Sequence, residues 1–207
     1  DALADVTQTS VGSGRVICVV GGSGGVGATT LAAGLAFVAA RTQPTLLIDA
    51  DPHSGGLDLL MGAERIPGWR WPRLASARGH LGDLTGQLPS VEDVDLLSMA
   101  RDESLPGCEL RPEQMNAVLL SAMRSHAVVV VDLSRTVGSA GREALRRAEL
   151  AVLVVRDDVR GVAAGCEVAR QIGGDCAGRG LVVRQGRSRL LEPRLVASGI
   201  DWPLLGS

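Results

Sequence analysis

A glycine-rich stretch with two threonines offers the clearest chemistry in this chain of 207 residues. Residues 21–30 read GGSGGVGATT and follow the apolar run 16–20. Glycines let successive backbone N–H groups curl around an anion, because no Cβ blocks the close approach or the unusual dihedral angles. The next residues, 29–40, predict a helix whose free N–H groups and positive dipole end point at the same place. The pattern therefore predicts a phosphate-binding loop between a strand and a helix.

The residues of this loop have distinct expected roles. Thr29 lies where such loops place the hydroxyl that ligates Mg²⁺. A sharp turn without a ligand is the alternative interpretation. The residues expected to contact a bound nucleotide are Ser23, Gly24, Gly25, Val26, Gly27, Ala28, Thr29 and Thr30.

The loop lacks the cation that usually accompanies it. Ala28 stands where lysine is usual, and the chain contains no lysine, so all 21 basic residues are arginines. A charge-assisted contact to phosphate contributes roughly 1.5–3 kcal/mol, which is 10- to 100-fold in affinity. Charge that develops during phosphoryl transfer also needs a cation, and only an arginine could supply it here. Arg135 and Arg160 are the candidates.

Acidic residues end two other apolar runs. Asp49 and Asp51 follow the run 45–48, and Asp132 follows the four valines 128–131. Ligands of open α/β sheets lie beyond the carboxyl ends of the strands. Mg²⁺ held among phosphates takes one or two carboxylates, often through water, and Asp132 fits that role. Asp49 and Asp51 alternate along the strand end, so we expect only one of them to face the phosphates directly, and we count Asp49 among the cofactor-binding residues. For any one of these acids a helix cap is the alternative.

Strand-like and helix-like segments alternate along the whole chain. This alternation predicts an α/β fold with a doubly wound, mostly parallel sheet flanked by helices. The expected strands are 16–20, 45–48, 94–98, 128–132, 150–155 and 181–183, with a further extended piece from residue 200. The expected helices are 29–40, 56–62, 113–125, 141–148, 161–172 and 192–198.

Composition sets the class of the chain. An apolar content of 45% with 21% charged residues is typical of a globular domain, which we place at 15–207, after a polar linker or disordered tail at 1–14. A net charge of −2 argues against nucleic acid as the primary ligand. The four cysteines have no paired spacing, which favours free thiols in a reducing cytoplasm. The chain does not begin with Met, which suggests part of a longer protein.

Two tryptophans stand out in the segment 67–89, where the alternating pattern breaks up. Trp69 and Trp71 flank Arg70. One interpretation is a lid that packs on the core. The other is a docking surface for a partner, since exposed tryptophans favour interfaces.

The loop 23–30, the acids 49–52 and the run 128–132 together resemble the MinD/ParA group of deviant Walker ATPases, which have a P-loop NTPase fold. Within that group the loop is similar to the CpaE/TadZ branch, which positions pilus and secretion machinery. A longer pattern resembles the CpaE-like septum-site-determining proteins called Ssd. That pattern comprises residues 55–62, 67–71, 132–135 and 157–160.

The resemblance implies ATP or ADP with Mg²⁺ as cofactors and a dimer in which two glycine loops face each other. Thr29 and Asp132 would serve Mg²⁺, and Asp51 would be the catalytic residue that places the hydrolytic water. The lysine that this group extends to the partner's phosphates falls at Ser23. The asparagine that it tends to place against adenine falls at Arg184.

The function that this resemblance implies is nucleotide-dependent spatial positioning, in septum-site determination and cell-division regulation or in pilus and secretion assembly. Without both lysines, the activity would be at most that of a weak Mg-dependent ATPase. The alternative is a pseudo-ATPase scaffold that binds protein partners without turnover. The expected partners are a second copy of the chain and cell-division or secretion proteins. The expected location is cytoplasmic, with recruitment to the septum, the pole or the inner face of the membrane through segments outside this chain.

Overall fold

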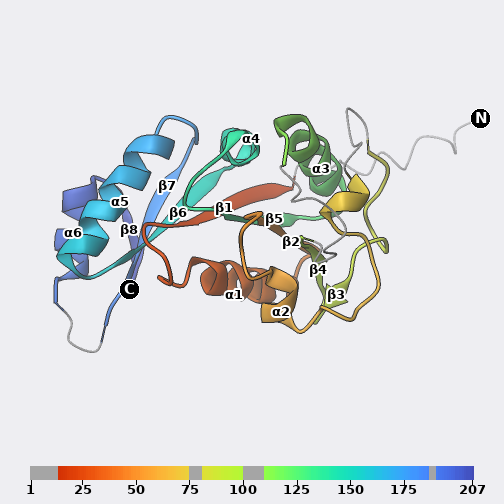
Figure 1. Cartoon of the computed structure of the whole chain (residues 1–207), viewed down its shortest axis with the longest axis horizontal. Helices are drawn as coiled ribbons and strands as arrows, with labels where there is room; N and C mark the ends of the chain where they lie inside the picture. Colours follow the sequence, from red (N-terminus) through yellow and green to blue (C-terminus); the bar gives the residue numbers. More distant parts are fainter. Residues whose placement is uncertain (1–13, 75–80, 100–109, 187–189) are drawn as a thin grey trace, which may run out of the picture.

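An eight-stranded sheet runs through the middle of the molecule, with helices on both faces (Figure 1). The structure is a computed structural model, and it describes residues 14–74, 81–99, 110–186 and 190–207. The strands are β1 (Arg15–Gly21), β2 (Thr45–Ala50), β3 (Ser90–Val91), β4 (Val94–Leu97), β5 (Val128–Leu133), β6 (Leu150–Arg156), β7 (Arg179–Arg184) and β8 (Leu204–Gly206). Their order across the sheet is β3-β4-β2-β5-β1-β6-β7-β8. All neighbours pair in parallel except β3 and β4.

Six α-helices and one 3-10 helix connect the strands within the described residues. They are α1 (Ala28–Ala40), α2 (Leu57–Met61), η1 (Trp71–Leu74), α3 (Pro112–Ser125), α4 (Ser139–Arg147), α5 (Val159–Ile172) and α6 (Pro193–Ile200). This arrangement confirms the predicted doubly wound, mostly parallel α/β fold.

The apolar strands supply a core on each face of the sheet. Successive side chains of a strand point to opposite faces. Cys18 of β1 accordingly belongs to the core cluster that includes residues of α3, α4, α5 and α6, whereas Val19 belongs to the cluster that includes residues of α1 and α2. The central strands are buried on both sides, which explains why β5 reads as an uninterrupted run of valines.

Three local features differ from the expectations. The antiparallel strand β3 is too short to leave a sequence pattern. The C-terminal helix α6 continues to Ile200, and Asp201, with a left-handed φ of 60°, ends it. The extended piece that we expected from residue 200 therefore begins only at Leu204.

The tryptophan segment packs on the core. Trp71 is buried, and its indole N–H donates to the carbonyl oxygen of Asp49 at 2.6 Å. Trp69 is half-buried, and the Arg73 guanidinium lies 6.0 Å from its ring centroid. This packing supports the lid interpretation over the docking surface.

Several expectations concern residues that the structure does not describe. The predicted linker at 1–14 lies outside the described residues, except for Gly14. Cys108 also lies outside the described residues. The thiols of Cys18, Cys166 and Cys176 are free.

Within the described ranges, no helix has the length and apolar character needed to cross a membrane.

Candidate functional site

The loop between β1 and α1 carries two residues in a left-handed conformation. Gly25 has a φ of 67° and Gly27 a φ of 96°, where a side chain would strain the backbone. The N–H of Leu31 donates to the Gly27 carbonyl at 2.9 Å and so closes the first turn of α1. No described side chain caps this helix. The N–H groups of its first turn thus remain available to an anion.

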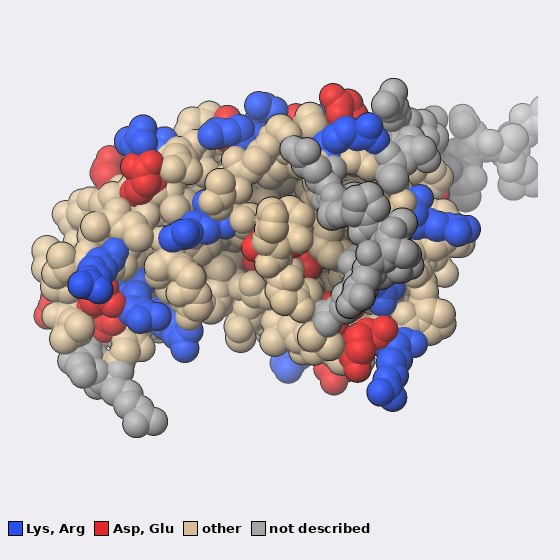
Figure 2. Space-filling model, in the orientation of Figure 1, with Lys and Arg blue, Asp and Glu red and all other residues tan. Residues whose placement is uncertain are grey.

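This loop forms one wall of a pocket of about 360 Å³. The other walls come from the ends of β5 and β7 and from the segment after β2. Every predicted loop residue from Ser23 to Thr30 lines the pocket, as do Asp51 and Asp132. Figure 2 shows acidic side chains within a hollow near the middle of one face of the molecule. The fold therefore brings the predicted residues together, with the exception of Asp49.

Asp49 turns its carboxylate toward its own loop. Its Oδ1 accepts a hydrogen bond from the Asp51 N–H at 3.1 Å, and its Oδ2 accepts from Ser54 Oγ at 3.0 Å and the Leu57 N–H at 3.2 Å. Both oxygens are used in shaping the segment that connects β2 to α2. Asp49 is absent from the pocket lining, so Asp51 is the one of the two acids that faces the pocket.

Asp132 is a buried acid at the end of β5. It lies opposite Asp49 in the register of β2 and β5 and is 2% exposed. The pKa of Asp132 is raised to about 7, chiefly by burial and also by the charges of Asp49 and Asp51, against the lowering effect of a hydrogen bond with the Thr29 side chain. The hydroxyl and the carboxylate that we assign to Mg²⁺ are thus in contact.

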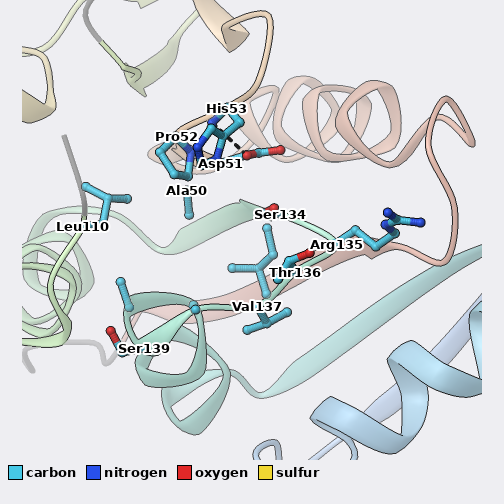
Figure 3. A pocket seen from close by; sticks show the side chains of 14 residues that line it. Ala50, Asp51, Pro52, His53, Leu110, Ser134, Arg135, Thr136, Val137 and Ser139 are labelled. Carbon is cyan, nitrogen blue, oxygen red and sulfur yellow. Dashed lines mark hydrogen bonds between the residues drawn. The ribbon is translucent and has the colours of Figure 1, made fainter. Parts of the chain in front are cut away.

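A second, larger cavity adjoins the phosphate pocket. It has a volume of about 590 Å³ and is lined by residues 50–53, Leu110 and residues 133–141 (Figure 3). Asp51 and Arg135 line both cavities. The Asp51 carboxylate also accepts a hydrogen bond from the His53 N–H at 3.0 Å. Asp51 therefore stands where water from the larger cavity could approach a ligand in the smaller one.

Among the residues that the structure describes, two arginines reach the phosphate pocket, and only one of them was a candidate cation. Arg135 lines the pocket from the end of β5. Arg184 lines it from the end of β7, and its Nη1 donates to the Gly25 carbonyl at 3.1 Å. Arg160 lines a separate cavity of about 610 Å³ beside Ser23 and Gly24. Sequence reasoning did not include Arg184 among the candidate cations, because it lies 159 residues from Gly25 and the sheet order brings the two together.

These residues fit Mg²⁺ together with a nucleotide. Among the described residues, no group of three or more His, Cys, Asp or Glu side chains could hold a metal ion. One hydroxyl and one carboxylate therefore have to be completed by phosphate oxygens and water, which is how Mg²⁺ is commonly bound. The open space at the Cβ positions of Gly24 and Gly25 leaves room for the phosphates to approach the backbone.

The parallel sheet, the glycine loop and the acid at the end of β5 together define a P-loop NTPase fold. Residues 17–164 match the family described as CobQ/CobB/MinD/ParA nucleotide binding domain, and this chain belongs to that family. Two uncharacterized proteins of Mycobacterium tuberculosis, from strains CDC 1551 and H37Rv, are each 39% identical over 196 residues. The match covers 94% of this chain and 54% of each relative, so the chain spans about half of their length.

Solved structures share the fold. A ParA family ATPase from Chlorobium tepidum TLS superposes with a TM-score of 0.82 at 16% identity, covering 94% of this chain and 83% of that one. The septum site-determining protein MinD of Pyrococcus horikoshii OT3, complexed with Mg-ADP, superposes with a TM-score of 0.73 at 22% identity. The match covers 92% of this chain and 79% of that one. The MinC:MinD cell division protein complex of Aquifex aeolicus superposes with a TM-score of 0.68 at 20% identity, and the match covers 92% of this chain and 79% of that one.

Proposed function

We propose that this domain binds ADP or ATP with Mg²⁺ in the pocket beside the β1–α1 loop. The observation that carries the proposal is the joint lining of one pocket by the loop residues 23–30, Asp51 and Asp132. Backbone N–H groups of the loop and of α1 bind the phosphates, and Thr29 and Asp132 serve Mg²⁺. The Mg-ADP complex of the Pyrococcus MinD, which has the same fold, supports this assignment.

We further propose that the domain is part of a MinD/ParA-like positioning protein of the CpaE/Ssd type. Its role would be in septum-site determination or in pilus and secretion assembly, as a homodimer that engages a division or secretion protein. The MinC:MinD complex of Aquifex aeolicus is a precedent for a protein partner on this fold. The proposed location is the cytoplasm, with recruitment to the septum, the pole or the membrane by segments beyond this domain. Light scattering with and without Mg-ATP measures the molar mass in solution. A chain that stays monomeric under both conditions would contradict the proposed homodimer.

A second candidate function is a scaffold that binds nucleotide or partners without turnover. The substitution of both usual lysines, by Ser23 and Ala28, favours it. Asp51 retains a position from which it could place water, which favours weak hydrolysis instead. Measured phosphate release that disappears in Asp51→Ala would establish turnover and exclude the scaffold.

Calorimetric titration with Mg-ADP tests nucleotide binding. We expect one site per chain in the wild type, and weaker binding in Thr29→Ala, with the loss larger in Mg²⁺ than in EDTA. Thr42→Ala, just beyond the other end of α1, is the matched control and should bind like the wild type. Absence of binding, or equal affinities of Thr29→Ala and Thr42→Ala, would contradict the proposal.

A further inference from the structure

The phosphate pocket contains a guanidinium at a place where a positive charge is unfavourable by itself. Arg184 Nη1 lies 3.1 Å from the point that a Cβ on Gly27 would occupy, and Gly27 directly precedes the first turn of α1. The N-terminus of a helix carries the positive end of the dipole, so a cation placed there is destabilised. An anion bound between the guanidinium and the helix N-terminus would interact favourably with both.

Arg184 is free to contact such an anion. Its side chain is exposed, and within the described residues no carboxylate forms an ion pair with it. A guanidinium has five N–H donors in a planar fork, and the hydrogen bond from Arg184 to the Gly25 carbonyl uses one of them. The remaining donors match the oxygens of a phosphate in pairs.

The backbone around Arg184 is held by a buried acid. Asp157, at the end of β6, is 2% exposed, and its Oδ1 accepts a hydrogen bond from the Gly186 N–H at 3.0 Å. The Asp157 N–H in turn donates to the Arg184 carbonyl at 3.3 Å. These two bonds fix the end of β7 against β6. The arginine therefore extends from an ordered strand end rather than from a long loop.

We infer that Arg184 supplies, from within the same chain, the positive charge that binds the nucleotide phosphates in this lysine-free pocket. This inference rests on the proposed function, since it assigns a residue to the same site. Arg184 is thus assigned to the phosphates, whereas the family resemblance places the residue at this position against adenine.

Titration of Mg-ADP and of adenosine into three variants tests the inference. Arg184→Ala should lower the affinity for Mg-ADP about 10- to 100-fold, the loss of one charge-assisted contact, and leave adenosine binding unchanged. Arg184→Lys should recover part of the affinity. Arg179→Ala removes the same charge from the other end of β7 and should bind Mg-ADP like the wild type.

The salt dependence gives an independent readout. Raising the ionic strength should weaken Mg-ADP binding more in the wild type than in Arg184→Ala, because the contact is electrostatic. Thermal melting of each variant verifies that it is folded. If the wild type binds and Arg184→Ala binds Mg-ADP as tightly or more tightly, the inference is overturned while the proposed function stands. A wild type that binds no nucleotide would overturn both.

Discussion

The indole N–H of Trp71 donates a hydrogen bond of 2.6 Å to the carbonyl oxygen of Asp49. Asp49 lies one residue beyond Ile48, the last residue of β2 that pairs with β4, and two residues before the pocket-lining Asp51. The buried ring of Trp71 also packs in the core cluster on the α3 and α4 face of the sheet. The acidic edge of the site is thus held in place by a side chain from the 3-10 helix η1.

Trp71→Phe should destabilise the protein. The substitution keeps an aromatic ring but leaves a buried carbonyl without its donor, which costs about 1–3 kcal/mol in the free energy of unfolding. Urea denaturation measures the loss. Trp69→Phe is the control, because Trp69 is only half-buried, and it should cost clearly less. Equal losses in the two variants would show that the hydrogen bond to Asp49 is unimportant.

Gly27→Ala should weaken both stability and nucleotide binding. Its φ of 96° is unfavourable for a residue with a Cβ, at a cost of roughly 1–2 kcal/mol, and the added methyl group would press on the Arg184 guanidinium. Gly24→Ala is the matched control, since Gly24 has open space at its Cβ position and no positive φ. Thermal melting and Mg-ADP titration of both variants provide the comparison. A Gly27→Ala protein as stable as Gly24→Ala would contradict the loop geometry.

Asp132→Asn should stabilise the nucleotide-free protein at alkaline pH. The pKa of Asp132 is about 7 in the folded state, above its ordinary value of 3.8, so the folded state binds this proton more tightly than the unfolded state. The contribution of this proton to the free energy of unfolding is then complete below pH 4. It is lost as the pH rises through 7, by up to about 4 kcal/mol. The neutral asparagine avoids this loss.

Urea unfolding at pH 8 and at pH 5 measures this effect. The free energy of unfolding of Asp132→Asn should exceed that of the wild type at pH 8, and this difference should be smaller by roughly 2–3 kcal/mol at pH 5. Asp83→Asn, at a carboxyl whose pKa is lowered by hydrogen bonds from Thr85, should show no gain at pH 8. An advantage of Asp132→Asn that is equal at the two pH values would exclude a buried, titrating Asp132.

Ala28→Lys should raise the affinity for Mg-ADP. The restored ammonium would add one charge-assisted contact to the phosphates, worth about 10- to 100-fold. Ala28→Gln has a long side chain without the charge and is the control, with an expected affinity close to that of the wild type. Titration calorimetry compares the three proteins. An unchanged affinity in Ala28→Lys would indicate that the loop does not present position 28 to the phosphates.

The parts of the fold that depend on local pattern could be predicted from the sequence. The valine run of β5 and the glycine loop before α1 each determine their own structure, because burial on both faces demands apolar residues and left-handed φ angles demand glycine. Asp132 could be placed at the site for the same reason, since it ends a buried strand. Chain order and sheet topology then bring these segments to one edge.

The contacts that depend on distant segments could not be predicted. Arg184 reaches Gly25 only because β6 and β7 follow β1 in the sheet, and the family resemblance linked position 184 to the adenine and not to the phosphates. Trp71 binds the Asp49 carbonyl from a stretch with no periodic pattern. The different directions of Asp49 and Asp51 could not be predicted either. Residues two apart in a strand point to the same face, and these two side chains diverge because β2 ends at Ala50, between them.

A crystal structure of this domain grown with saturating Mg-ADP is the most direct test of the proposed site. The site predicts a diphosphate bound to N–H groups of residues 24–29, with Mg²⁺ between it, Thr29 and Asp132, and with the Arg184 guanidinium on a phosphate oxygen. A pocket without nucleotide in those crystals, or an ADP molecule bound elsewhere on the surface, would contradict it.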